Sequence, residues 1–246
     1  IVSAGNTGAL LAKSLVFLRN IGGIDRPAIT ALIPNLKGFC IMLDVGANVD
    51  CKPQHLLQFG IMGNAFGKTV LNIDNPTVGL LNIGSEKTKG NKVTKTAFSM
   101  MEESSLNFIG NIEGTDVFRG AVDVVVCDGF AGNVALKITE GVAQVFADAF
   151  RKEREGSIRS RLGMLLVRNG LRSLHSRLDY TEYGGAPFLG VNGVCIKAHG
   201  SSNAKAIKNA IRAAVRSREG DLVGRIREEL HLNTEVEAAE GVGSRI

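Results

Sequence analysis

The chain has 246 residues, of which 44% are hydrophobic and 22% charged, as is ordinary for a globular protein large enough to bury a full core. Its formal net charge of +5 favours anionic partners, although a solvated basic surface without any partner would carry the same charge. Only 5% of the residues are aromatic and tryptophan is absent, which argues against a nucleic-acid partner bound by base stacking.

The sequence opens on IVSAGNTG, a pattern typical of a strand end entering a turn, so we expect that an N-terminal portion is missing. Neither a signal peptide nor an apolar run long enough to span a bilayer is visible. The four cysteines are widely separated and form no CxxC pair, which predicts thiols in a reducing, cytoplasmic compartment rather than disulfides or zinc ligands: Cys40, Cys51, Cys127 and Cys195.

Short β-branched runs alternate with longer helical patterns, which predicts an α/β fold with a mostly parallel sheet between two layers of helices. We expect strands at Ala28–Ile33, Phe39–Asp44, Val78–Ile83, Asn107–Ile109, Asp123–Cys127 and Gly193–Ile196. We expect helices to begin near Thr7, Pro53, Asn91, Asn133 and Ser201, followed by a last helix around Leu222. No linker divides the chain, so we interpret residues 1–246 as a single domain whose acidic tail, 232–246, is frayed.

One segment, 157–178, interleaves leucines with arginines at a helical spacing. A basic amphipathic stretch of this kind can lie on an anionic membrane surface. It can equally pack against the body of the protein or against a second subunit, and the sequence leaves these alternatives open.

Four polar, Gly-rich turns follow apolar strands and precede probable helices: SAGNTG (Ser3–Gly8), DVGANVD (Asp44–Asp50), CDGFAGNVALK (Cys127–Lys137) and AHGSSNAK (Ala198–Lys205). Helix N-termini present free N–H groups and a partial positive charge, which suits phosphate. Any one such turn can be ordinary helix capping, whereas four of them favour an anion-binding site. None matches a Walker A loop or a GxGxxG dinucleotide fingerprint.

Two further side chains are candidates for chemistry. Lys89 follows the predicted strand ending at Ile83, where a lysine can neutralise phosphate or a developing oxyanion, or can simply be solvated. His199 is the one histidine in a Gly/Ser turn, and it can act as an acid, a base or a phosphate donor, or only hold the turn together. Ser201 and Ser202 lack a GxSxG context, which disfavours a serine-acyl intermediate.

Taken together, these segments resemble the acyl carrier protein:phosphate acyltransferase family (PlsX). The matching strings run in family order over nearly the whole chain: SAGNTGAL, LDVGANVDC, QFGIMG, VGLLNIG, KGN, NFIGNIEG, DVVVCDGFAGNVALK, YGGAPFLGVNG and KAHGSSNAKA. Two features depart from the family. Its N-terminal DAMGGD-like loop is absent, and Thr115 stands where the family usually has arginine.

The resemblance implies a three-layer α/β/α fold related to isocitrate dehydrogenase and phosphotransacetylase, and a homodimer. It implies transfer of a fatty acyl group from acyl carrier protein to inorganic phosphate, which gives acyl phosphate for phospholipid synthesis, and a membrane-associated tip at 157–178. We expect no metal and no nucleotide cofactor, and no nucleic-acid partner.

The mechanism that we expect is direct attack of phosphate on the thioester, because a thiol leaves readily and phosphate is already anionic. The predicted catalytic residues are Lys89, Asn133, which could donate to the oxyanion, and His199. The predicted substrate-binding residues are Ser3, Asn6, Thr7, Asn48, Asp128, Lys137, Gly200, Ser201 and Ser202.

Three rival classes stay open at this point. They are a nicotinamide-dependent dehydrogenase of the same fold, a short-chain phosphate acetyl- or butyryltransferase, and a non-catalytic scaffold on lipid surfaces. The missing fingerprint loop and the absence of an Asp cluster count against the dehydrogenase.

Overall fold

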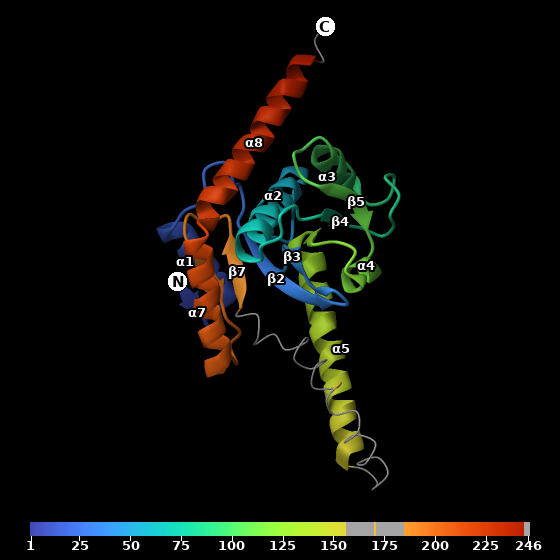
Figure 1. Ribbon diagram of the computed structural model, residues 1–246, viewed down its shortest axis with the longest axis vertical. Helices are drawn as coiled ribbons and strands as arrows, with labels where there is room; N and C mark the ends of the chain where they lie inside the picture. Colours follow the sequence, from blue (N-terminus) through green and yellow to red (C-terminus); the bar gives the residue numbers. More distant parts are fainter. Residues whose placement is uncertain (156–169, 171–184, 244–246) are drawn as a thin grey trace.

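The computed structural model describes residues 1–155, 170 and 185–243. In this part of the chain, eight strands form one sheet in the order β1-β8-β7-β2-β3-β6-β4-β5 (Figure 1). The strands are β1 (Val2–Ser3), β2 (Ala28–Asn35), β3 (Gly38–Leu43), β4 (Val78–Leu81), β5 (Phe108–Ile112), β6 (Val124–Val126), β7 (Ala186–Leu189) and β8 (Cys195–Lys197).

Strand direction divides the sheet. Strands β3, β6, β4 and β5 run parallel to one another, as in a βαβ fold. The β2–β3 hairpin then reverses the direction, and the antiparallel pairs β2·β7 and β7·β8 follow. Because β1 pairs with β8 in parallel, both of these strands run opposite to β3, β4 and β6.

The helices begin where local sequence favours an N-terminus. Asn6, Asn91 and Asn203 each accept a hydrogen bond from a backbone N–H three residues on, and Pro53 occupies the first turn of its helix. The helices are α1 (Thr7–Phe17), α2 (Pro53–Val70), α3 (Lys92–Glu102), α4 (Gly114–Arg119), α5 (Gly129–Glu155), α7 (Ala204–Glu219) and α8 (Leu222–Gly243).

Alternation of side chains along the strands produces a core on each face of the sheet, and a third, smaller cluster joins β8 to α7. Ile41 and Leu43 of β3 face the core that contains α2, α3 and α8. Cys40 and Met42 face the opposite core, to which residues of α1, α4 and α5 contribute. The helices therefore cover both faces, and the predicted three-layer α/β/α architecture is confirmed.

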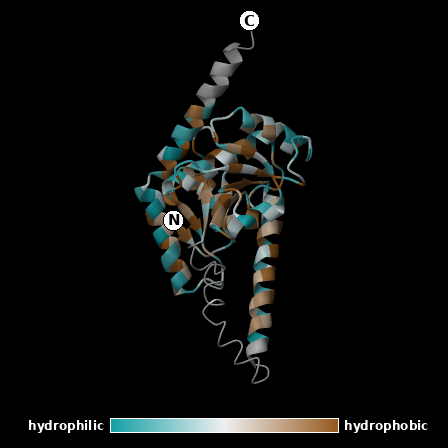
Figure 2. Cartoon of the chain, turned by 45° about the vertical axis from the view of Figure 1, so that its right-hand side comes forward, coloured by the Kyte–Doolittle hydropathy of each residue, from teal (hydrophilic) through white to brown (hydrophobic). Residues whose placement is uncertain are grey.

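Helix α5 continues well past the sheet, and in Figure 1 its second half stands away from the body. Its inner side packs Ala131, Ala135 and Leu136 against the core. Its outer side carries an exposed apolar stripe, seen as brown segments along the helix in Figure 2, made of Val134, Ile138, Val142, Val145, Phe146 and Phe150. The basic segment 157–178 lies outside the described residues except for Gly170. The acidic tail is helical as far as Gly243.

The strands lie close to where the sequence predicts them, but two elements were not predicted. One is β7, which contains Pro187, and the other is α4, which is only six residues long. Helix α5 begins at Gly129, four residues before Asn133, and α7 begins at Ala204, three residues after Ser201.

Candidate active site

The four polar turns are joined in two pairs. In the first pair, the turn after β1 (residues 3–8) lies beside the turn after β8 (residues 198–203), because the N–H of Ala198 donates to the carbonyl of Ser3 at 2.9 Å. In the second pair, the turn after β3 (residues 44–50) contacts the turn after β6 (residues 127–133), where the N–H of Gly129 donates to the carbonyl of Asn48 at 2.7 Å. We call these the β1/β8 turns and the β3/β6 turns.

The carboxylate of Asp44 organises the β3/β6 turns. It is fully buried and accepts hydrogen bonds from the backbone N–H groups of Ile29, Ala47 and Asn48. The side-chain amide of Asn48 donates to the same carboxylate at 3.0 Å and to the carbonyl of Pro27 at 2.8 Å. Burial raises the pKa of the Asp44 carboxyl, and the donated hydrogen bonds oppose that rise. Asp44 therefore fixes the shape of the loop from within.

Close backbone packing locks the start of α5 onto this loop. A Cβ atom on Gly132 would lie 1.9 Å from the carbonyl oxygen of Asp44, and one on Gly129 would lie 2.7 Å from that of Asn48. Only glycine permits these approaches. The two glycines of the DGFAGN string are thus required at this place by packing.

A cleft of about 270 Å³ opens beside the β3/β6 turns. The carboxyl ends of β4 and β6, the turn before α2 and the first turns of α3 and α5 form its walls. It is lined by Val49, Asp50, Cys51, Leu56, Leu80, Leu81, Asn91, Val93, Thr94, Cys127, Asp128 and Ala131. Its buried lining residues are Leu56, Leu80 and Cys127, and Asp50 and Asp128 supply two carboxylates beside the N-termini of the helices.

The two thiols in the cleft are poor nucleophiles. Burial, reinforced by the negative charge of Asp44, raises the pKa of Cys51 to about 11. Burial likewise raises the pKa of Cys127 far above its ordinary value. Because the thiolate is the reactive form, neither side chain suits an acyl-cysteine intermediate at neutral pH.

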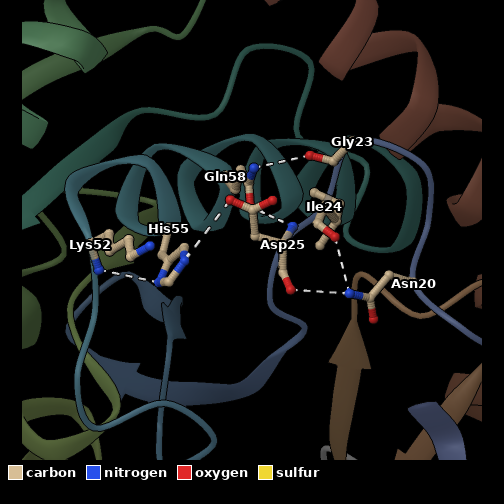
Figure 3. Close-up of polar contacts among 7 residues, drawn as sticks. All are labelled: Asn20, Gly23, Ile24, Asp25, Lys52, His55 and Gln58. Atoms are coloured by element: carbon tan, nitrogen blue, oxygen red, sulfur yellow. Dashed lines mark hydrogen bonds and ion pairs between the residues drawn. The ribbon is translucent and has the colours of Figure 1, made fainter. Parts of the chain in front are cut away.

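A polar cluster secures the beginning of α2, next to the cleft (Figure 3). The N–H of Lys52 donates to Nδ1 of the buried His55 at 3.2 Å, and Nε2 of His55 lies 4.0 Å from Oδ2 of Asp25. Gln58 accepts from the N–H of Asp25 and donates to the carbonyl of Gly23. These contacts tie the segment before β2 to the helix that borders the cleft.

Lys89 lies in the loop between β4 and α3. Its ammonium is 3.8 Å from Oε1 of Glu86, and the side chain is partly exposed. Asn82 supports the loop by donating to the carbonyl of Lys89 and to Oδ1 of Asn111. Asn91, at the end of this loop, caps α3 and lines the cleft.

The predicted residues of the β1/β8 turns adjoin one another. Ser3 accepts from the N–H of Gly5, and Asn6 caps α1, which begins at Thr7. In the turn after β8, Nδ1 of His199 lies 2.7 Å from the hydroxyl of Ser201 and also accepts a hydrogen bond from the backbone N–H of Ser201. A Cβ on Gly200 would be 4.0 Å from the carbonyl of Ala4, and the N–H of Ser202 donates to the carbonyl of His199.

The predicted residues at the start of α5 have different surroundings from one another. Asp128 caps the helix by accepting from the N–H of Ala131 at 2.7 Å, and it lines the cleft. Asn133 is exposed and packs beside Gly46. Lys137 lies one turn further along the helix and forms an exposed ion pair with Glu140 at 2.6 Å.

Sequence reasoning missed several cleft residues, notably Asp50, Cys51 and Thr94. The sequence did contain a signal for them, because Asp50 and Cys51 are the last two residues of the LDVGANVDC string and Thr94 lies in the first helical turn after KGN. Among residues 1–155, 170 and 185–243, no group of three or more His, Cys, Asp or Glu side chains is arranged to hold a metal ion. No helix in the same part of the chain is long and apolar enough to cross a membrane.

The structure has the three-layer α/β/α fold of the phosphotransacetylases. The structure is similar to EutD phosphotransacetylase from Staphylococcus aureus, with a TM-score of 0.56 and 16% identity over 87% of this chain and 60% of that one. It is similar to a phosphotransacetylase from Streptococcus pyogenes, with a TM-score of 0.54 and 19% identity over 89% of this chain and 62% of that one. At these identities the likeness shows the fold alone.

The sequence identifies the family. Residues 1–225 match the family described as fatty acid synthesis protein. The chain is 52% identical over 241 residues to a protein named phosphate acyltransferase from Pelotomaculum thermopropionicum, covering 98% of this chain and 70% of that protein. It is 51% identical over 231 residues to another of that name from Thermoanaerobacterium thermosaccharolyticum, covering 94% and 69%. The chain belongs to this family of phosphate acyltransferases.

Proposed function

We propose that the protein transfers a fatty acyl group from acyl carrier protein to inorganic phosphate, forming acyl phosphate for phospholipid synthesis. The observation that carries the proposal is the match over residues 1–225 to the family of phosphate acyltransferases, which includes both pairs of turns. The turns add a physical reason, because helix N-termini beside glycine-rich loops favour phosphate.

The proposed chemistry is a single displacement. A phosphate oxygen attacks the thioester carbonyl carbon and forms the new C–O bond, while the carbonyl oxygen takes up the negative charge. Collapse of this adduct re-forms the carbonyl and breaks the C–S bond, and the pantetheine sulfur leaves as a thiolate. The raised pKa values of Cys51 and Cys127 support this route over one through a cysteine thioester. The protein then contributes position and electrostatic stabilisation rather than a nucleophile of its own.

We assign phosphate to the β1/β8 turns. Residues 3–8 and 198–205 contain no Asp or Glu, whereas Asp50 and Asp128 would repel an anion at the cleft. In this proposal Ser3, Asn6, Thr7 and Gly200–Ser202 surround the phosphate and His199 orients it. Lys89 and Asn133 follow β4 and β6, which run opposite to β1 and β8. Their proposed roles, adding positive charge and donating to the developing oxyanion, therefore belong to the opposite edge of the sheet and not to the β1/β8 turns. Asn48 and Asp128 shape the β3/β6 turns, and Lys137 lies one helical turn beyond Asn133.

The experiment that tests the proposal mixes the protein with palmitoyl-acyl carrier protein and phosphate and follows the release of free thiol. We expect release that depends on phosphate and continues with EDTA present. Replacing the long-chain donor with acetyl-coenzyme A distinguishes a long-chain acyltransferase from a phosphate acetyltransferase. Adding nicotinamide nucleotides tests for a dehydrogenase. The proposal fails if thiol release is absent or does not change with phosphate.

We further propose a cytoplasmic homodimer with peripheral membrane contact. Support for the dimer comes from the exposed apolar stripe of α5, where Ile138 is 60% and Val145 is 68% exposed. Changing both to Gln should shift a dimer to a monomer in sedimentation velocity.

Membrane contact through 157–178 rests on its sequence alone, and changing Leu165 and Leu166 to Gln should reduce co-sedimentation with phosphatidylglycerol vesicles while turnover on soluble substrate persists. A variant that melts or dissociates would place these leucines in a protein interface instead.

A further inference from the structure

Lys197 occupies a position that sequence analysis passed over. It is the last residue of β8, and its Cα is paired in register with that of Ser3 in β1. Two residues earlier, Sγ of Cys195 lies 3.2 Å from Oγ of Ser14 in α1. Because residues two apart in a strand point to the same face, the side chain of Lys197 lies on the face that α1 covers.

The start of α1 lies towards Lys197. Helix α1 follows β1 through a short turn and packs back over β8, so it runs opposite to β8. Ser14 lies over Cys195, and Thr7, seven residues earlier, is about 10 Å nearer the N-terminal end of the helix. Along β8, Lys197 lies about 7 Å beyond Cys195 in the same direction. The lysine is therefore beneath the positive end of the helix dipole.

The ammonium of Lys197 has no anionic partner in the described part of the chain. It donates to the carbonyl of Ala198, which turns it towards the end of the strand, and the structure records no ion pair for it. Burial lowers the pKa of Lys197, and no carboxylate among the described residues offsets that effect. A half-buried cation next to a positive helix terminus is electrostatically unfavourable unless an anion joins it.

The surroundings of this ammonium are suited to an anion. Ser3, His199 and Ser201 provide hydroxyl and imidazole groups on the two adjoining turns. A second helix, α7, begins after Asn203 at the same pair of turns. We propose that Lys197 is the residue that neutralises the bound substrate phosphate, with its Nζ in direct contact with a phosphate oxygen between the β1/β8 turns. This inference rests on the proposed function and adds a catalytic residue to it.

The first test compares variants in equilibrium dialysis with radiolabelled inorganic phosphate. Lys197→Met should weaken phosphate binding about tenfold to a hundredfold, as expected for one charge-assisted contact, and Lys197→Arg should recover part of the loss. The control is Lys208→Met, which removes the same charge from an exposed position on α7.

In turnover, Lys197→Met should raise the KM for phosphate and leave the KM for acyl carrier protein unchanged. Equal phosphate binding by Lys197→Met and the wild type, or an effect confined to the KM for acyl carrier protein, would overturn the proposal.

The second test needs no variant and no acyl donor. Amine acylation of the wild-type protein, followed by peptide mass spectrometry, compares Lys197 with Lys208 in the presence of phosphate or chloride. Phosphate should slow the labelling of Lys197 and leave that of Lys208 unchanged, whereas identical labelling of Lys197 in the two salts contradicts the inference. Both binding tests still decide the role of Lys197 if wild-type turnover fails, in which case the proposed reaction alone is wrong.

Discussion

The backbone N–H of Lys52 points at Nδ1 of His55 across 3.2 Å, so the buried imidazole acts as an acceptor at the first turn of α2. An imidazolium has no lone pair at Nδ1, and protonation would replace this hydrogen bond with two opposed donors. Burial lowers the pKa of His55, and the positive charges of Arg26 and Lys52 lower it further, while Asp25 acts in the opposite direction. The structure therefore holds His55 in its neutral form.

The free energy of unfolding should consequently depend on pH through His55. Because the folded-state pKa is below the ordinary value of 6.5, the unfolded chain binds the proton more tightly. The stabilisation of the folded state by neutral His55 is present above about pH 6.5 and is lost as the pH falls below that value. Urea unfolding at pH 7.5 and pH 5.5 measures this loss.

The matched variant for this experiment is His55→Gln, because Gln can accept the same N–H at the third helical position and does not titrate. It should unfold with a smaller difference between the two pH values than the wild type. If both proteins lose the same stability on acidification, the dependence arises elsewhere.

Two glycines of α5 should respond in opposite ways to alanine. At Gly132 a Cβ would lie 1.9 Å from the carbonyl oxygen of Asp44, so the backbone must move, and we expect a loss of about 3 kcal/mol. At Gly141 nothing lies within 4 Å and the position is exposed, so alanine should stabilise the helix by about 0.5–1 kcal/mol. Thermal melts of the two variants should shift in opposite directions, and a neutral Gly132→Ala would show that the contact between the β3 and β6 turns is loose.

Much of the fold follows from local sequence. Asn91 and Pro53 mark helix starts, and the run Val124–Val126 reads as a buried strand because it is β-branched. Strand β7 escaped prediction because Pro187 lacks an N–H and argues against a strand. In the structure, Pro187 lies opposite Ile196 in an antiparallel pair, where tertiary pairing overrides that preference.

The candidate site was predicted in its parts but not in its grouping. All four turns look alike in sequence, since each follows an apolar strand and precedes a helix. Which turns meet depends on strand direction, and the β2–β3 hairpin reverses the sheet between the two pairs. Lys197 was missed for a related reason. A lysine after a short strand resembles a solvated residue until its register with Ser3 is known.

The cleft thiols should be unreactive and dispensable. With a pKa of about 11, raised by burial, Cys51 is almost wholly protonated at neutral pH. Its alkylation by iodoacetamide should be slow at pH 8 and should accelerate as the pH rises towards 11. Cys51→Ser should retain phosphate-dependent thiol release within about threefold of the wild type. A variant that loses turnover while its melting temperature is unchanged would favour a covalent cysteine intermediate.

Lys89 and Lys92 offer a test of the loop between β4 and α3. The two lysines are three residues apart and carry the same charge, but they differ in their surroundings. Lys89 folds beside Gly84 and Glu86, whereas Lys92 is exposed in the first turn of α3. If Lys89 contributes charge to the reacting groups, Lys89→Ala removes a charge-assisted contact of about 1.5–3 kcal/mol, which is roughly one to two decades in rate. Lys92→Ala should change kcat/KM by less than about threefold, as for an exposed charge.

Thermal melts guard against a structural explanation, because the exposed ion pair with Glu86 is worth at most about 1 kcal/mol and both variants should melt near the wild type. Equal and small kinetic effects would exclude Lys89 from the site and leave Lys197 as the cation that we assign to phosphate.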